Sequence, residues 1–129
     1  MKLLLDTHIA LWWLNEHEKL PFQVKDMLLN NEHARYISMA SAWEIAIKVS
    51  TGRLAGLSGG VSAFLGKINQ MPISVLSITS RHLEIVETLP FIHRDPFDRL
   101  LVATAKADGM TILTADENIK KYDVPSAWC

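Results

Sequence analysis

The sequence has a single cysteine and no excess of positive charge, and each shortage excludes a class of protein. Cys129 has no second cysteine to pair with, so no disulfide can form within the chain, which fits a reducing compartment such as the cytoplasm. Lysine and arginine total 13 against 14 aspartate and glutamate residues, whereas a non-specific nucleic-acid binder is usually basic overall. Any binding of nucleic acid must therefore depend on a local patch of cations.

Long hydrophobic runs are also missing. No apolar run is long enough to cross a bilayer, and the three leucines before Asp6 are too few for the hydrophobic part of a signal peptide. We therefore expect a cytoplasmic protein without a membrane segment. The chain has 129 residues, of which 49% are hydrophobic, and this is enough for one domain over residues 1–129 with a substantial core.

Short apolar runs alternate with helical patterns along the chain. Strands are predicted at 2–6, 35–38, 73–78 and 111–114, with a candidate edge strand in 124–129. Helices are predicted at 7–16, 21–31, 41–52, 61–71, 79–90, 95–109 and 115–122, and the most loop-like segment is 53–60. This alternation indicates an α/β fold: a mainly parallel central sheet of four or five strands with helices on both faces, three layers in all.

Acidic residues stand where predicted strands lead into helices. Asp6 and Asp116 follow strands, and Glu44 and Asp98 lie in the first turns of the helices that come after strands. Ligands of parallel sheets bind beyond the carboxyl ends of the strands, so all four acids can point into one crevice. Gathered carboxylates repel each other unless a cation neutralises them. Oxygen ligands without a Cys/His cluster suit Mg²⁺ or Mn²⁺, and the pattern predicts such a site.

Each acid also has a structural explanation as a helix cap. Capping-box patterns occur three times, as Ser41-x-x-Glu44, Asp95-x-x-Asp98 and Thr114-x-x-Glu117. An acid near a helix N-terminus gains about 0.3–1 kcal/mol from the helix dipole. For a single acid the cap is the more ordinary explanation. Asp6 is the hardest to explain in this way, because it ends a strongly apolar strand.

Four motifs of the chain, LLLDTHIALWWL, SAWEIAIK, DRLLVATA and ILTADENI, resemble in order and approximate spacing those of PIN-domain nucleases. The resemblance is closest to the VapC-type toxins of type II toxin–antitoxin pairs, and it covers nearly the whole chain. It matches the acids of the family to Asp6, Glu44, Asp98 and Asp116, and its hydroxyl residue to Thr7. Asp95 is an extra acid, and it is open whether it supports a metal ligand, caps the helix, or does both.

The resemblance implies a PIN-like three-layer domain that cuts RNA with Mg²⁺ or Mn²⁺, forms a homodimer and binds a cognate antitoxin. Asp6 and Asp98 are then expected as principal metal ligands, with Asp116 bound directly or through water. Glu44 would hold a second ion or orient the attacking water, and Thr7 would bind a metal-bound water. Contacts to phosphates are expected from four cations, with an ordinary solvated surface as the alternative: Lys48, Arg53, Arg94 and Arg99.

The helix predicted after the first strand is apolar at every position from Ile9 to Leu14, which indicates burial on more than one side. Trp12 and Trp13 are adjacent and point about 100° apart, so we expect that both cannot face the same core. One of them is then predicted to lie near an interface with a second subunit or the antitoxin. The alternative is a wide core with one half-exposed tryptophan.

Three other functions compete with a nuclease. A haloacid-dehalogenase-like phosphotransferase needs Asp-x-Asp after its first strand, but His8 stands at the second position. A receiver domain needs paired acids after strand one and a late lysine, and both are missing here. A PIN-like module that binds RNA or protein without cutting is the remaining alternative, and the presence of all four acids argues against it.

Overall fold

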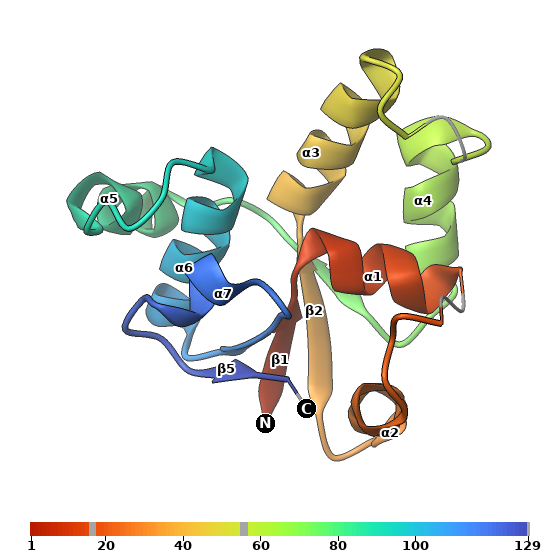
Figure 1. Ribbon diagram of the computed structural model, residues 1–129, viewed down its shortest axis with the longest axis horizontal. Coiled ribbons are helices and arrows are strands. Elements are labelled where there is room, and N and C mark those ends of the chain that lie inside the picture. The colour runs from red at the N-terminus through yellow and green to blue at the C-terminus, as the bar shows by residue number, and fades with distance from the viewer. Residues whose placement is uncertain (16–17, 55–56, 129) are drawn as a thin grey trace.

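The computed structural model describes residues 1–15, 18–54 and 57–128, and within them it has five strands and seven helices (Figure 1). The strands are β1 (Lys2–Leu5), β2 (Ala34–Ser38), β3 (Ser74–Leu76), β4 (Thr111–Leu113) and β5 (Ser126–Ala127). The helices are α1 (Thr7–Leu14), α2 (Phe22–Leu29), α3 (Met39–Ser50), α4 (Gly60–Asn69), α5 (Ser80–Thr88), α6 (Pro96–Asp108) and α7 (Glu117–Lys120).

All strand pairs are parallel, and the strands lie in the order β3-β2-β1-β4-β5. The predicted α/β fold is therefore confirmed, and the candidate edge strand at the C-terminus is present as β5. The chain moves outward from β1 through β2 to β3, and then crosses to the other side of β1 to form β4. This reversal between β1 and β4 is the place where open parallel sheets bind ligands.

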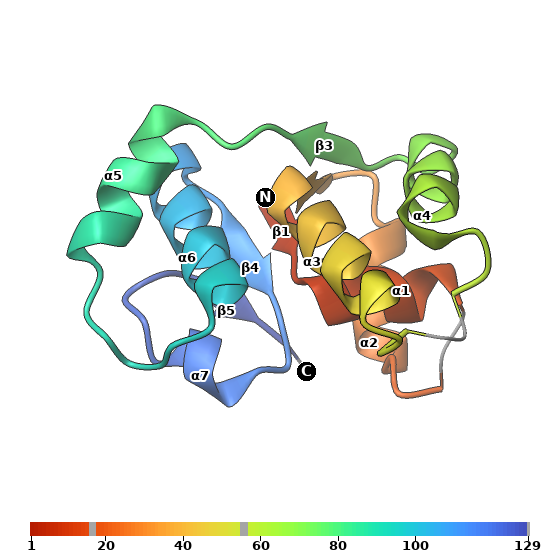
Figure 2. The same cartoon turned by 90° about the horizontal axis from the view of Figure 1, so that it is seen from above.

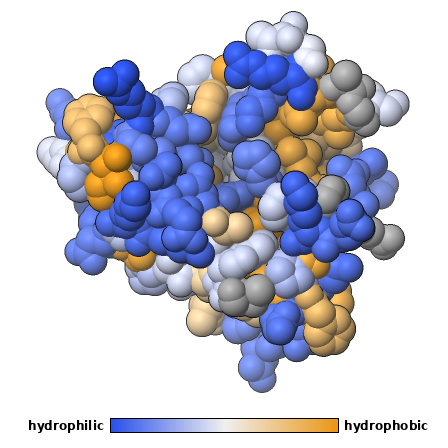
Figure 3. Space-filling model, viewed as in Figure 1, coloured by the Kyte–Doolittle hydropathy of each residue, from blue (hydrophilic) through white to orange (hydrophobic). Residues whose placement is uncertain are grey.

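Each face of the sheet has its own hydrophobic core. Alternate residues of β1 point to opposite faces, so Leu3 and Leu5 pack with residues of α1, α2, α3 and α4, whereas Leu4 packs with residues of α6 and α7. Figure 2 shows the corresponding layers, with α1 to α4 on one side and α5 to α7 on the other. Figure 3 shows hydrophobic side chains in the region between α1, α3 and α4.

Two of the predicted capping boxes are wrong. The α3 helix begins two residues earlier than predicted, at Met39, because the Ser38 hydroxyl accepts a hydrogen bond from the Ala40 amide, and Ser41 lies buried inside the helix. Asp116, not Thr114, caps α7. The third prediction is right for Asp95, which caps α6.

The two adjacent tryptophans also differ from expectation. Both Trp12 and Trp13 are half-buried, and both pack against the same core, the one on the α1 side of the sheet. Part of the predicted loop at 53–60 and the cysteine at position 129 lie outside the described residues. No helix in the described ranges combines the length and the apolar character needed to cross a membrane.

Candidate functional site

Asp6 and Thr114 meet where β1 and β4 end, at the reversal of the sheet. The two strands pair in parallel, and the Asp6 amide continues the ladder by donating to the Leu113 carbonyl at 3.1 Å. The Thr114 hydroxyl donates to Asp6 Oδ2 at 2.5 Å, and the other carboxylate oxygen accepts from the Ile9 amide at 3.1 Å. Asp6 therefore caps α1 and is held in a single orientation, only 5% exposed.

Asp98 enters the same space from α6. The helix begins at Pro96, and Asp95 Oδ1 accepts hydrogen bonds from the amides of Phe97 at 2.9 Å and Asp98 at 3.2 Å. Because Asp95 satisfies these amides, the carboxylate of Asp98 is not needed as a cap. It accepts instead from His93 Nε2 at 3.1 Å.

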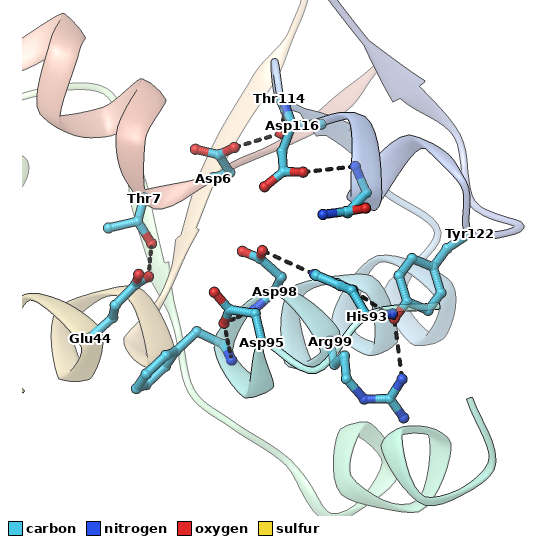
Figure 4. Close-up of polar contacts among 12 residues, drawn as sticks. Asp6, Thr7, Glu44, His93, Asp95, Asp98, Arg99, Thr114, Asp116 and Tyr122 are labelled. Atoms are coloured by element: carbon cyan, nitrogen blue, oxygen red, sulfur yellow. Dashed lines mark hydrogen bonds and ion pairs between the residues drawn. The ribbon is translucent and has the colours of Figure 1, made fainter. Parts of the chain in front are cut away.

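Asp116 completes the group at the start of α7. Its side chain accepts from the Asn118 amide at 2.7 Å, and its own amide donates to the Thr114 hydroxyl at 3.0 Å. Figure 4 shows Asp6, Asp98 and Asp116 facing a common space from three different elements, with Asp95 at its edge. The sequence predicts four acids in one crevice, and three of them, Asp6, Asp98 and Asp116, face this space.

Without a cation nearby, the negative charges of these carboxylates repel one another. The pKa of Asp98 is raised to about 7, mainly by burial and also by the negative charges of Asp95, Asp116 and Asp6, against the lowering effect of the hydrogen bond from His93. Burial also raises the pKa of Asp6, against the hydrogen bond from Thr114. A positive charge in this space would relieve both effects.

These oxygens fit a hard divalent cation. Within the described ranges, no three His, Cys, Asp or Glu side chains lie close enough to one another to enclose an ion. Mg²⁺ does not need such a cage, because it commonly takes one or two carboxylates and keeps several waters. The residues therefore suit an ion with few direct protein ligands.

Glu44 lies to one side, on the α3 helix. Its Oε1 accepts from the Thr7 hydroxyl at 2.7 Å, and its Oε2 pairs with Lys48 Nζ at 2.9 Å. The Thr7 hydroxyl also lies 2.9 Å from that of Ser41, so its proton is engaged within the protein. Figure 4 shows the Glu44 side chain pointing at Thr7, on the α1 and α3 side of the common space.

A chain of hydrogen bonds behind Asp98 was not foreseen from the sequence. His93 Nδ1 lies 2.9 Å from the Tyr122 hydroxyl, and Arg99 donates to the same hydroxyl at 3.1 Å. With the imidazole proton on Nε2, Arg99 donates to Tyr122, Tyr122 to His93, and His93 to Asp98. The proximity of His93 to two aspartates was the only sequence signal, and none pointed to Tyr122.

Arg99 is not at the surface, although it was expected there from the sequence, in contact with phosphates or solvent. It is 5% exposed, and its guanidinium donates to the carbonyls of Pro90, Val86 and Leu89. The prediction that it contacts phosphates is therefore wrong. The other three predicted cations, Lys48, Arg53 and Arg94, line one cavity beside the carboxylates.

This chain is similar to known proteins over nearly its whole length. The family model described as "PIN domain" matches residues 3–125. The chain is 29% identical over 125 residues to "Ribonuclease VapC22" of Mycobacterium tuberculosis, covering 95% of this chain and 92% of the relative.

Solved structures with a similar fold include VapBC2 from Rickettsia felis bound to a promoter DNA fragment, with a TM-score of 0.72, 17% identity and 98% of both chains covered. Another is DNA-bound VapBC from Salmonella typhimurium, with a TM-score of 0.71 and 17% identity, covering 100% of this chain and 99% of the other. At these identities the likeness concerns the fold.

Proposed function

The chain belongs to the PIN domain family, and on that basis we propose that it is a metal-dependent endoribonuclease, the toxin of a type II toxin–antitoxin pair. One observation carries the proposal: Asp6, Asp98 and Asp116 come from three elements and face one space, with Asp6 buried and Asp98 partly buried. The similarity to a relative named as a ribonuclease supports RNA as the substrate.

Asp6 and Asp98 would bind Mg²⁺ or Mn²⁺ directly, and Asp116 directly or through water. The bound ion would lower the pKa of a water molecule and neutralise the charge that develops on the phosphate. Thr114 and the Ile9 amide keep the Asp6 oxygens oriented, and His93 does the same for Asp98.

Glu44 would orient the attacking water or hold a second ion from the opposite side of the space. Its hydrogen bond from Thr7 and its ion pair with Lys48 keep the carboxylate in place. In this arrangement Thr7 acts on Glu44 and not on a metal-bound water.

The metal claim is tested with Asp6→Asn, Asp98→Asn and a matched control, Asp26→Asn, which removes an exposed carboxylate on α2. Cleavage of a fluorogenic RNA by the first two variants should fall to the level of the buffer blank, and the control should cut normally. Added Mn²⁺ should raise the melting temperature of the wild type and of the control, but not of Asp98→Asn. Full activity in EDTA, or in both site variants, would contradict the proposal.

The alternative is a PIN-like module that binds RNA or protein without cutting. It predicts RNA binding with no cleavage by the wild type in added Mg²⁺ or Mn²⁺. The same assay therefore separates the two functions.

We also propose a homodimer and a cognate antitoxin as partners. The fold is shared with chains solved in VapBC complexes, and the apolar α1 helix leaves Leu11 to Leu14 only partly buried in the isolated chain. Sedimentation of the purified chain tests the dimer. Co-expression with the product of the neighbouring gene, followed by copurification and loss of RNA cleavage, tests the antitoxin.

A further inference from the structure

A cavity of about 470 Å³ opens beside the carboxylates, between α3 and the start of α6. We call it the α3–α6 pocket, and its lining residues are Glu44, Ile47, Lys48, Arg53, Arg94, Asp95, Pro96 and Phe97. Glu44 and Asp95 belong both to this lining and to the margin of the carboxylate space, so the two regions adjoin. The volume lies within the range of about 300–1,000 Å³ that is usual for small-ligand pockets, and it has room for one nucleotide.

Three cations gather in the α3–α6 pocket, although the chain as a whole has a net charge of −1. Lys48 pairs with Glu44. Arg53 and Arg94 are exposed, and in the described residues neither has an ion-pair partner. Because the chain has no overall excess of positive charge, it needs a local patch of cations such as this one to bind nucleic acid. The patch stands next to acids that would otherwise repel a phosphate.

The pocket also carries aromatic surface. The ring of Phe97 packs edge-on against Trp43, with 5.1 Å between ring centroids and 74° between their planes. Trp43 is 58% exposed, and the neighbouring Ile47 is 37% exposed. Large apolar side chains that are exposed to solvent do not contribute to the hydrophobic core, so their presence here calls for another explanation. Grooves for single-stranded nucleic acid combine cations for the backbone with aromatic rings for the bases.

We propose that the α3–α6 pocket takes one nucleotide of the RNA next to the phosphate that is cleaved. Arg53 and Arg94 contact its phosphates, and Phe97 and Trp43 contact its base. The proposal rests on the proposed nuclease function and assigns part of its substrate binding to residues outside the carboxylate group. In this proposal, the contacts in the pocket determine which base is preferred at that position.

Binding is measured by fluorescence anisotropy of a short labelled single-stranded RNA, in EDTA and in an Asp98→Asn background, so that the RNA stays intact. Phe97→Leu and Arg94→Gln should each weaken binding about tenfold. Arg94→Gln should also reduce the dependence of binding on salt by about one phosphate contact. The controls Phe22→Leu and Arg81→Gln remove an exposed ring and an exposed cation outside the pocket and should bind like the parent.

Phe97 is only partly exposed, so each variant is first checked for an unchanged melting temperature. Trp43→Leu, at a more exposed position, replaces Phe97→Leu if the latter unfolds. In the active chain the same substitutions should act mainly through KM. If the wild type cuts no RNA but the pocket variants still lose binding, the nuclease function fails, and only the assignment of the pocket to RNA binding stands.

Unchanged RNA binding in Phe97→Leu, Trp43→Leu and Arg94→Gln overturns the pocket proposal and leaves the nuclease function intact. The surface is instead a protein interface if these variants bind RNA normally but sediment as smaller species than the wild type. That result also overturns the proposal.

Discussion

The Nε2 atom of His93 lies 3.1 Å from the Oδ2 atom of Asp98, and among the described residues no other side chain forms a hydrogen bond with that carboxylate. His93→Ala should therefore let Asp98 rotate and should lower cleavage about 10- to 100-fold, the usual cost of losing a partner behind a metal ligand. His93→Gln keeps an N–H donor and should recover part of the loss.

A melting-temperature titration with Mn²⁺ separates this positioning role from general damage to the fold. The midpoint of the Mn²⁺ effect should move to higher concentration in His93→Ala and return part of the way in His93→Gln. Equal losses of activity in both variants, with an unchanged Mn²⁺ midpoint, would show that His93 does not orient Asp98.

The raised pKa of Asp98 makes the metal-free chain less stable as pH rises. Its ordinary value is 3.8, and in the folded chain it is about 7, so the folded state takes up this proton more readily than the unfolded state. The resulting stability is fully present below pH 3.8 and is lost as pH rises through about 7. Asp6, whose pKa is also raised, acts in the same direction.

Calorimetry in EDTA should therefore show a melting temperature that falls between about pH 5 and pH 8. Asp98→Asn should flatten this fall, because the amide does not titrate. Added Mg²⁺ should also reduce it by neutralising the carboxylates. A wild-type melting temperature that rises over this range, or an unchanged slope in Asp98→Asn, would contradict the assignment.

Arg99 should matter for stability and not through contact with RNA. Its buried guanidinium donates to three carbonyls and to Tyr122, and it lies 4.2 Å from the centre of the Phe91 ring. Arg99→Gln leaves several of these acceptors unpaired and should lower the free energy of unfolding by about 3 kcal/mol. Urea denaturation measures this change, and exposed Arg94→Gln should stay within about 0.5 kcal/mol of the wild type.

Trp12 and Trp13 should have different effects when truncated. The Trp12 ring lies 6.4 Å from that of Trp128, whereas Trp13 lines an open cavity of about 580 Å³ with Leu14 and Leu29. Trp12→Ala should mainly destabilise the fold, by about 2–3 kcal/mol, less than the loss of a fully buried tryptophan. Trp13→Ala should mainly weaken association with a second chain. Sedimentation of both variants, alone and with the antitoxin, shows whether Trp13 lies at an interface with a second chain or whether the helix belongs only to the core.

The sequence was sufficient to predict the elements and the acids at their ends. Strands followed by a polar residue mark the edge of a parallel sheet, so Asp6 and Asp116 could be placed without coordinates. Asp95 could be predicted as a cap because Pro96 fits the first position of a helix. These are local signals, and they depend only on neighbours in the chain.

What could not be predicted depended on partners distant in the sequence. Ser38 and Ser41 are equally good caps by type, but pairing of β2 with β3 extends to Ser38 and makes it the boundary. The Thr114 hydroxyl was expected to cap a helix, but it donates to Asp6. Arg99 was expected at the surface, but carbonyls from α5 and the segment after it surround its guanidinium.

The hydrogen bond between Thr114 and Asp6 joins residues 108 positions apart. It is a contact of very high sequence separation, and such contacts form late because a long loop must close first. During synthesis Asp6 emerges first and stays without its partner until β4 has been made. A growing chain therefore completes its carboxylate space only near the end of translation, and a fragment that stops before β4 has none.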